Sequence, residues 1–147
     1  MACLLLVEDE ADIRTVLAEV LVDAGHEVVE AECADAAALL LDGPDGFDML
    51  VTDINMPGFL DGIGLAARFR KRHANRPILY VTGRPDALRQ VRMWPNREAA
   101  LVKPYGLLSL VSTVQTMLVA AVLDTERKVG ADAASLLHCP QVAPAAA

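Results

Sequence analysis

Short apolar runs alternate with helical patterns along most of this chain, and that alternation restricts its fold more than any other feature. The apolar runs cover residues 4–7, 28–29, 49–52, 78–82 and 99–102. Runs that are apolar throughout are typical of strands that are buried on both faces. Such strands, when helices separate them, form a parallel sheet with helices on both sides. The sequence therefore predicts an α/β fold, a doubly wound five-stranded parallel sheet with five flanking helices.

The segments between the runs carry the spacing of amphipathic helices. Between the first two runs, five apolar residues recur at helical spacing, and Gly25 is placed to end the helix. These residues are Ile13, Val16, Leu17, Val20 and Leu21. Further helices are expected at about 34–41, 63–72 and 107–123. The fourth helix begins near Pro85 and is expected to be short or irregular, because Trp94 and Pro95 stop it early.

The last predicted helix is unusual because residues 104–123 contain no charged side chain and approach the length of a membrane span. Four polar residues nevertheless form one stripe at helical spacing, with apolar residues on the opposite face. The stripe consists of Ser109, Ser112, Thr113 and Thr116. We therefore expect an amphipathic helix on the domain and no membrane span. Because the stripe is small and uncharged, we expect it to pack against a partner.

The chain length suits one domain that buries a proper core. We expect a domain over residues 1–123 and a C-terminal extension over 124–147 that is partly flexible, with no output domain. The three cysteines have no metal-ligand spacing, and their odd number leaves no complete disulfide framework. The first residues run directly into acidic ones and do not resemble a signal peptide. These features predict a cytoplasmic location.

Charge is distributed unevenly along the chain. Residues 1–62 contain fifteen acids and one base, Arg14, whereas residues 63–123 contain ten bases and two acids. This asymmetry indicates either partners steered by charge or simply two differently solvated faces. The basic run near residues 68–76 has no interleaved aromatic residues of the kind that stack on nucleic-acid bases. We therefore expect no nucleic-acid partner.

Polar residues of particular kinds end or directly follow four of the apolar runs. They are Glu8, Asp9, Asp53, Thr82 and Lys103. In a doubly wound sheet the carboxyl ends of the strands meet at one edge, so these side chains are expected to converge there. Each residue alone has an ordinary explanation, such as a turn aspartate or a first-turn helix acid. Their joint occurrence at four strand ends is what favours a functional site.

Three carboxylates close together repel one another unless a cation neutralises them, and Mg²⁺ suits carboxylate oxygens. We expect Asp9 and Asp53 to bind Mg²⁺ directly, Glu8 to act through water, and the backbone carbonyl of Asn55 to complete the protein ligands. Such a site suits phosphoryl transfer, with Asp53 as the nucleophile that forms an aspartyl phosphate. The Lys103 ammonium and the Thr82 hydroxyl would contact the phosphoryl oxygens.

Four segments resemble the receiver domain of two-component response regulators, and the resemblance covers about residues 2–123. They are LLLVEDE at 4–10, VTDINMPG at 51–58 with Asp61 and Gly62 following, YVTG at 80–83 and LVKPY at 101–105. The resemblance implies the flavodoxin-like receiver fold and phosphoryl transfer to Asp53 from a phosphohistidine, with Mg²⁺ required. It also implies a sensor histidine kinase or a histidine phosphotransfer protein as donor and a downstream protein as target, and it leaves a homodimer open. A receiver is a phosphoacceptor signalling module and not an enzyme with an external substrate.

Three departures from the family pattern bear on how such a domain would signal. Ala100 stands where many receivers have an aromatic residue, the loop at 57–62 is one residue longer than its commonest form, and the fourth helix is expected to be short. Our hypothesis is a single-domain response regulator, and the alternative is a constitutive scaffold with an intact pocket but no switch. A third hypothesis, a phosphatase-type hydrolase that uses Asp53, needs a general acid or base, for which Arg84 is the nearest residue.

Overall fold

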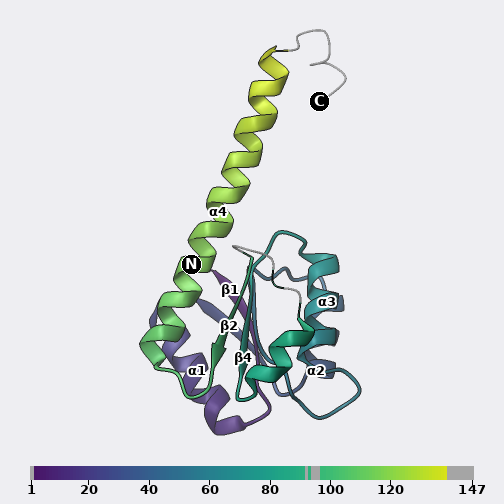
Figure 1. The fold of residues 1–147 in the computed structure, drawn as a ribbon, viewed down its shortest axis with the longest axis vertical. Coiled ribbons are helices and arrows are strands. Elements are labelled where there is room, and N and C mark those ends of the chain that lie inside the picture. Colours follow the sequence, from purple (N-terminus) through teal and green to yellow (C-terminus); the bar gives the residue numbers. More distant parts are fainter. Residues whose placement is uncertain (1, 92, 94–96, 139–147) are drawn as a thin grey trace.

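The computed structural model describes residues 2–91, 93 and 97–138, which form a five-stranded parallel sheet covered by helices (Figure 1). The strands are β1 (Cys3–Val7), β2 (Glu27–Ala31), β3 (Met49–Asp53), β4 (Ile78–Thr82) and β5 (Glu98–Val102). Their order in the sheet is β2-β1-β3-β4-β5, and every neighbouring pair is parallel. The predicted fold class is therefore confirmed.

Helices cover both faces of this sheet. They are α1 (Ala11–Asp23), α2 (Ala34–Asp42), α3 (Gly62–Arg72), the 3₁₀ helix η1 (Pro85–Gln90) and α4 (Leu107–His138). Contacts join α2 to α3 and α1 to α4, so these two pairs lie on opposite faces (Figure 1). The fourth helix is short, as predicted, although Trp94 and Pro95 lie outside the described residues.

The alternation of side chains along each strand divides the core into two clusters. Leu5 and Val7 of β1 pack toward α2 and α3, whereas Leu4 and Leu6 pack toward α1 and α4. Successive side chains of a strand point to opposite faces, so a strand covered on both sides must be apolar at every position. The continuous apolar runs in the sequence therefore have a direct physical cause.

The last helix is longer than expected. We predicted a helix at 107–123, but α4 continues without interruption to His138 and leaves the domain (Figure 1). The segment from Asp124 onward is rich in alanine, leucine and charged residues that favour helices, and it contains no proline before Pro140. Residues 139–147 of the predicted C-terminal extension lie outside the described residues, and the domain boundary at 123 stays a prediction.

The polar stripe on α4 is present, and its two threonine hydroxyl groups bond to the helix itself. Thr113 Oγ1 donates to the Ser109 carbonyl at 2.7 Å, and Thr116 Oγ1 donates to the Ser112 carbonyl at 2.9 Å. The opposite face buries Leu110, Val114 and Met117 in the domain core, as in an amphipathic helix.

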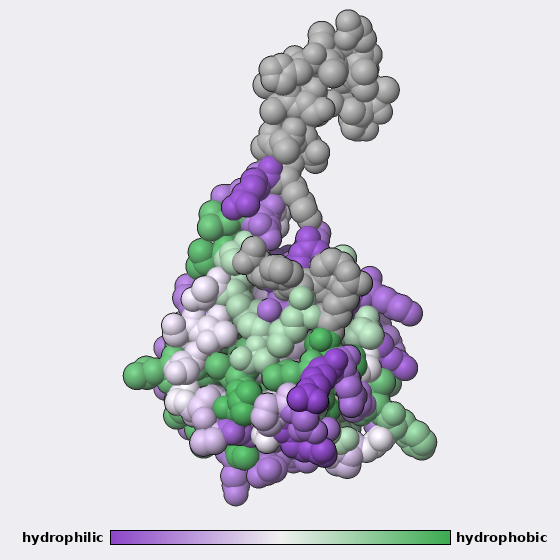
Figure 2. Space-filling view, viewed as in Figure 1, coloured by the Kyte–Doolittle hydropathy of each residue, from purple (hydrophilic) through white to green (hydrophobic). Residues whose placement is uncertain are grey.

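Residues Leu107–Arg127 of α4 satisfy the length and composition of a membrane span, among the residues that were described. Three buried side chains on this segment belong to the core that also includes the sheet, whereas most of the segment is not buried. Val119, Val122 and Leu123 of this segment are exposed. Figure 2 shows hydrophobic and hydrophilic residues side by side where the helix leaves the domain.

Candidate functional site

The polar residues at the strand ends converge at one edge of the sheet, as predicted. Asp53 is the last residue of β3, Glu8 follows β1, and Lys103 follows β5. The register pairs Val7 with Thr52, so the end of β1 lies beside the end of β3. This parallel alignment places the Glu8 and Asp53 carboxylates side by side.

Three carboxylates form a compact cluster at this edge. Oxygens of Glu8, Asp9 and Asp53 all lie within 4.8 Å of one another. Glu8 and Asp53 are buried, at 1% and 7% exposure, whereas Asp9 is exposed. The cluster therefore combines two desolvated charges with one that faces solvent.

Lys103 is the cation that offsets part of this negative charge. Its Nζ lies 3.0 Å from Asp53 Oδ2 and 3.4 Å from Glu8 Oε2. Burial alone would lower the pKa of Lys103, but its hydrogen bond to Asp53 and the charges of Asp53 and Glu8 outweigh burial and raise this pKa. Lys103 is accordingly held in its charged form between the two buried carboxylates.

Burial raises the pKa of Glu8, although Lys103 and the Glu10 backbone N–H act in the opposite direction. That N–H donates to Glu8 Oε1 at 3.3 Å. The Glu8 carbonyl accepts a hydrogen bond from Arg14 Nη1 at 2.8 Å, and Arg14 also pairs with Glu30 at 3.5 Å. The single base of the first 62 residues thus anchors the loop that carries the acids.

Asn55 and Thr82 lie at the same edge but make different contacts. The Asn55 backbone N–H donates to Asp53 Oδ1 at 3.2 Å. The buried Thr82 hydroxyl donates to the Arg84 carbonyl and accepts from the Arg84 N–H at 3.0 Å, so it is engaged in the turn after β4. Its predicted contact with a phosphoryl oxygen would replace the bond to the Arg84 carbonyl. The Asn55 carbonyl as a metal ligand also stays a prediction.

Gly62 is a site residue whose role we did not predict from the sequence. Its N–H donates to the Ile54 carbonyl at 2.9 Å, and a Cβ at this position would lie 1.9 Å from the Asp53 carbonyl oxygen. Asp61 caps α3 by accepting a hydrogen bond from the Gly64 N–H at 2.8 Å. An Asp-Gly pair at a predicted helix start was the signal that could have indicated this close approach.

The donors at this edge fit a divalent hard cation. All of them are oxygens, and two buried carboxylates with only one lysine leave negative charge to be neutralised. Mg²⁺ takes one or two carboxylates and keeps several waters, which suits a cluster with one exposed member. The residues present are therefore compatible with Mg²⁺ and with a bound phosphoryl group.

An apolar groove adjoins the cluster. It has a volume of about 450 Å³, lies between α1 and the connection from β5 to α4, and shares Lys103 with the acidic site. Its other lining residues are Asp12, Ile13, Val16, Leu17, Pro104, Tyr105 and Leu107. Val16, which belongs to the helical stripe in the sequence, is 44% exposed on this groove. The groove is thus an apolar surface next to the acidic site.

Comparisons with known proteins point in one direction. Residues 4–115 match the family described as response regulator receiver domain. The chain is 37% identical to the response regulator receiver protein CpdR of Brucella abortus over 123 residues, which covers 82% of this chain and 100% of CpdR. It is 35% identical to the response regulator protein FleR of Pseudomonas aeruginosa over 114 residues, 77% of this chain but only 24% of FleR.

A solved structure has the same arrangement of elements. The crystal structure of a response regulator receiver protein from Sinorhizobium medicae superposes with a TM-score of 0.77 at 26% identity, and the match covers 82% of this chain and 96% of that one. Much of the chain outside residues 4–115 belongs to the extended part of α4.

Proposed function

Because this chain belongs to the response regulator receiver domain family, we propose that it is a single-domain response regulator that accepts a phosphoryl group on Asp53. The observation that carries the proposal is the placement of Lys103 Nζ 3.0 Å from Asp53 Oδ2 inside a cluster of three carboxylates. A lysine in this position meets both requirements of phosphoryl transfer, since it orients the acceptor and stabilises the transferred charge.

The chemistry follows from the surroundings of Asp53. An Asp53 carboxylate oxygen attacks the phosphorus of a phosphohistidine, so an oxygen–phosphorus bond forms and the nitrogen–phosphorus bond breaks. The hydrogen bond from the Asn55 N–H orients the carboxylate, and Lys103 moves from Asp53 Oδ2 to a phosphoryl oxygen. When Mg²⁺ is bound, it supplies positive charge to the phosphoryl oxygens. Glu8, Asp9, Asp53 and the Asn55 carbonyl would hold it.

We propose that the phosphodonor docks on the groove between α1 and the β5–α4 connection. The donor is a sensor histidine kinase or a histidine phosphotransfer protein, which has to bring its histidine to Asp53 from the open side of the site. The groove is mostly apolar and includes Lys103, so a donor seated there lies next to the acidic cluster. Exposed charges around the site would steer the encounter.

A cytoplasmic location accords with the absence of a disulfide framework in the sequence.

The proposed output is a phosphorylation-dependent interaction with a downstream protein, through the surface of η1, β5 and α4. The Thr82 hydroxyl joins the site to this surface because it bonds to Arg84, the residue before η1. If the Thr82 hydroxyl donated its hydrogen bond to a phosphoryl oxygen instead of the Arg84 carbonyl, the turn between β4 and η1 would be released. Other switches work in this way, with a local charge change that biases a mobile element. The exposed stripe on α4 provides a surface for this target or for a second copy of the chain.

Labelling of Asp53 tests the central proposal. Incubation with a small phosphodonor and Mg²⁺ is expected to add one phosphoryl group, which intact-mass analysis detects, whereas Asp53→Ala should remain unlabelled. Asp42→Ala removes an exposed acid at the C-terminal end of α2. It is the matched control and should label like the parent. If Asp53→Ala labels as well as the parent, the acceptor is another residue and the proposal is wrong.

A constitutive scaffold with an intact pocket remains the second candidate, favoured by one observation on β5. Ala100 of β5 pairs in register with Tyr80 of β4, which is buried. Residue 100 is therefore a small side chain, and β5 has no large side chain there that could move when Asp53 is phosphorylated. Amide exchange of residues 84–91 with and without a beryllofluoride phosphoryl mimic separates the two candidates. A switch predicts altered exchange in η1, and unchanged exchange would favour the scaffold.

A further inference from the structure

The loop that joins β3 to α3 is held at two separate points. At its base, the Gly62 N–H donates to the Ile54 carbonyl at 2.9 Å, and the Asn55 N–H donates to Asp53 Oδ1 at 3.2 Å. Its tip is tied to a different part of the chain, since the Phe59 N–H donates to Asp35 Oδ2 at 3.1 Å. One carboxylate of α2 therefore anchors the tip of the loop that carries Asn55.

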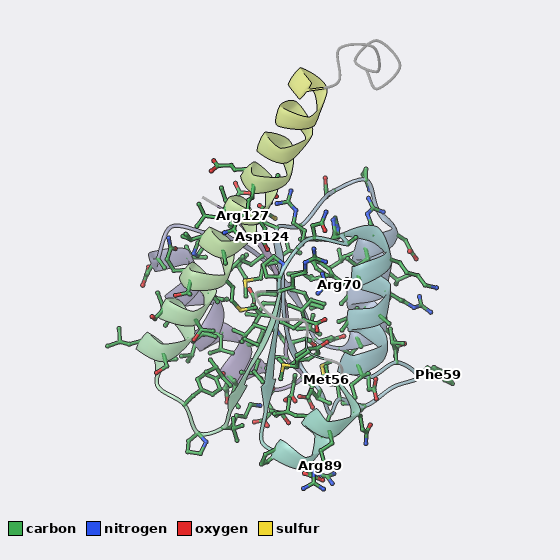
Figure 3. All side chains as sticks on the ribbon, turned by 45° about the horizontal axis from the view of Figure 1, so that its top comes forward. Met56, Phe59, Arg70, Arg89, Asp124 and Arg127 are labelled. Atoms are coloured by element: carbon green, nitrogen blue, oxygen red, sulfur yellow. The ribbon has the colours of Figure 1, made fainter. Side chains whose placement is uncertain are left out.

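The contact between Asp35 and this loop is close enough to restrict the residue at position 58. Gly58 has a φ of +118°, and a Cβ there would lie 2.3 Å from Asp35 Oδ2. Only glycine adopts such a backbone readily and also lets the carboxylate approach this closely. The Phe59 side chain points away from the domain and is fully exposed (Figure 3), so it does not hold the tip. The tether is consequently the backbone contact with Asp35.

Asp35 is itself well fixed. It lies in the first turn of α2, where a negative charge is favoured by the helix dipole. The helix begins at a cap in which Cys33 Sγ accepts a hydrogen bond from the Ala36 N–H, and α2 packs directly against α3. Because α2 is fixed in this way, its Asp35 carboxylate holds the loop tip in a defined position.

We propose that Asp35 is a positioning residue that orders the β3–α3 loop for cation binding at the phosphoacceptor site. This inference rests on the proposed function, because Asn55 lies at the base of this loop and its carbonyl is an expected ligand. Met56, the next residue, is buried in the core (Figure 3), so the tether holds the segment after Met56 directly and holds Asn55 only through the path of the loop. Without Asp35, ordering of this segment would have to accompany cation binding and would weaken it.

The test compares Mg²⁺ affinity in three variants by titration calorimetry. Asp35→Ala is expected to weaken Mg²⁺ binding by about fivefold, the effect of losing one hydrogen bond that orders a binding loop. Asp35→Asn keeps an acceptor oxygen but loses the charge, so it should restore most of the affinity. Asp42→Ala removes one acid from the same helix and should bind Mg²⁺ like the parent. In metal-free Asp35→Ala, the Phe59 amide should also exchange faster with solvent.

A second variant tests the same contact from the loop side. Gly58→Ala should weaken Mg²⁺ binding in the parent but less so in an Asp35→Ala background, where the carboxylate that meets the new Cβ is gone. Parent-like affinity of Asp35→Ala would overturn the proposal, and so would Asp35→Asn binding as weakly as Asp35→Ala, since charge would then be the cause. If the parent itself neither binds Mg²⁺ nor labels on Asp53, the proposed function fails instead.

Discussion

Replacing Gly62 with alanine is expected to lower the free energy of unfolding by about 3 kcal/mol or more, at the upper end of what overpacking costs. The added Cβ would lie 1.9 Å from the Asp53 carbonyl oxygen and 2.8 Å from the Ile54 Cα. Both are backbone atoms at the end of a buried strand, so no side-chain rotation relieves the contact. Either α3 or the end of β3 has to move.

This movement should also impair phosphoryl transfer, because it displaces the nucleophile. The Asp53 carboxylate is attached to the backbone that the new methyl group meets, and a displacement of about 1 Å lowers transfer rates by about 100-fold. Urea unfolding gives the stability, and intact-mass labelling gives the rate. Gly83→Ala is the matched control, since nothing lies within 4 Å of its Cβ and its φ is ordinary. Gly62→Ala stability equal to that of Gly83→Ala would contradict the prediction.

Replacing Lys103 with methionine is expected to have the second large effect. Two buried carboxylates would lose the ammonium that lies 3.0 Å and 3.4 Å from their oxygens. Removing one partner of a buried ion pair costs about 3–5 kcal/mol, and the partial exposure of Lys103 reduces this to about 2 kcal/mol. Labelling of Asp53 should fall at least about 100-fold, since an aimed cation no longer meets the phosphoryl oxygens.

The stability loss in Lys103→Met should depend on pH and on Mg²⁺. Lys103 lowers the pKa of Glu8, which burial already raises, so the variant raises that pKa further. An acid with a raised pKa in the folded state is penalised above that pKa and relieved below its ordinary value. The stability deficit of Lys103→Met relative to the parent should therefore shrink as pH falls from the raised pKa of Glu8 to its ordinary value. Added Mg²⁺ should also reduce this deficit.

Unfolding curves of Lys103→Met and the parent at several pH values measure this dependence. Lys71→Met, the same substitution on the exposed side of α3, serves as control and should change stability little. A deficit that stays constant with pH and Mg²⁺ would mean that Lys103 contributes through packing and not through charge.

The central strands β1, β3 and β4 could be predicted closely from the sequence, because burial on both faces demands continuous apolar runs. Three of the four α-helices could also be predicted closely, whereas the edge strand β2 is mostly unburied and showed only Val28 and Val29. The run at 49–52, for example, corresponds to β3, and the stripe from Ile13 to Leu21 lies within α1. The end of α4 could not be predicted in the same way. Beyond Leu123 the sequence has helical potential but no clear stop signal before Pro140, and α4 continues to His138.

The candidate site, like the fold, could be predicted in part from the sequence. The sequence by itself determined which chemistry is present, since Glu8, Asp9, Asp53 and Lys103 follow apolar runs whose parallel pairing brings strand ends to one edge. Only the tertiary structure decided how those groups are supported. Arg14 under the Glu8 carbonyl, Gly62 against the Asp53 backbone and Asp35 at the tip of the loop are contacts between elements far apart along the chain. Such contacts depend on how helices and loops pack in three dimensions, which periodicity along one chain does not encode.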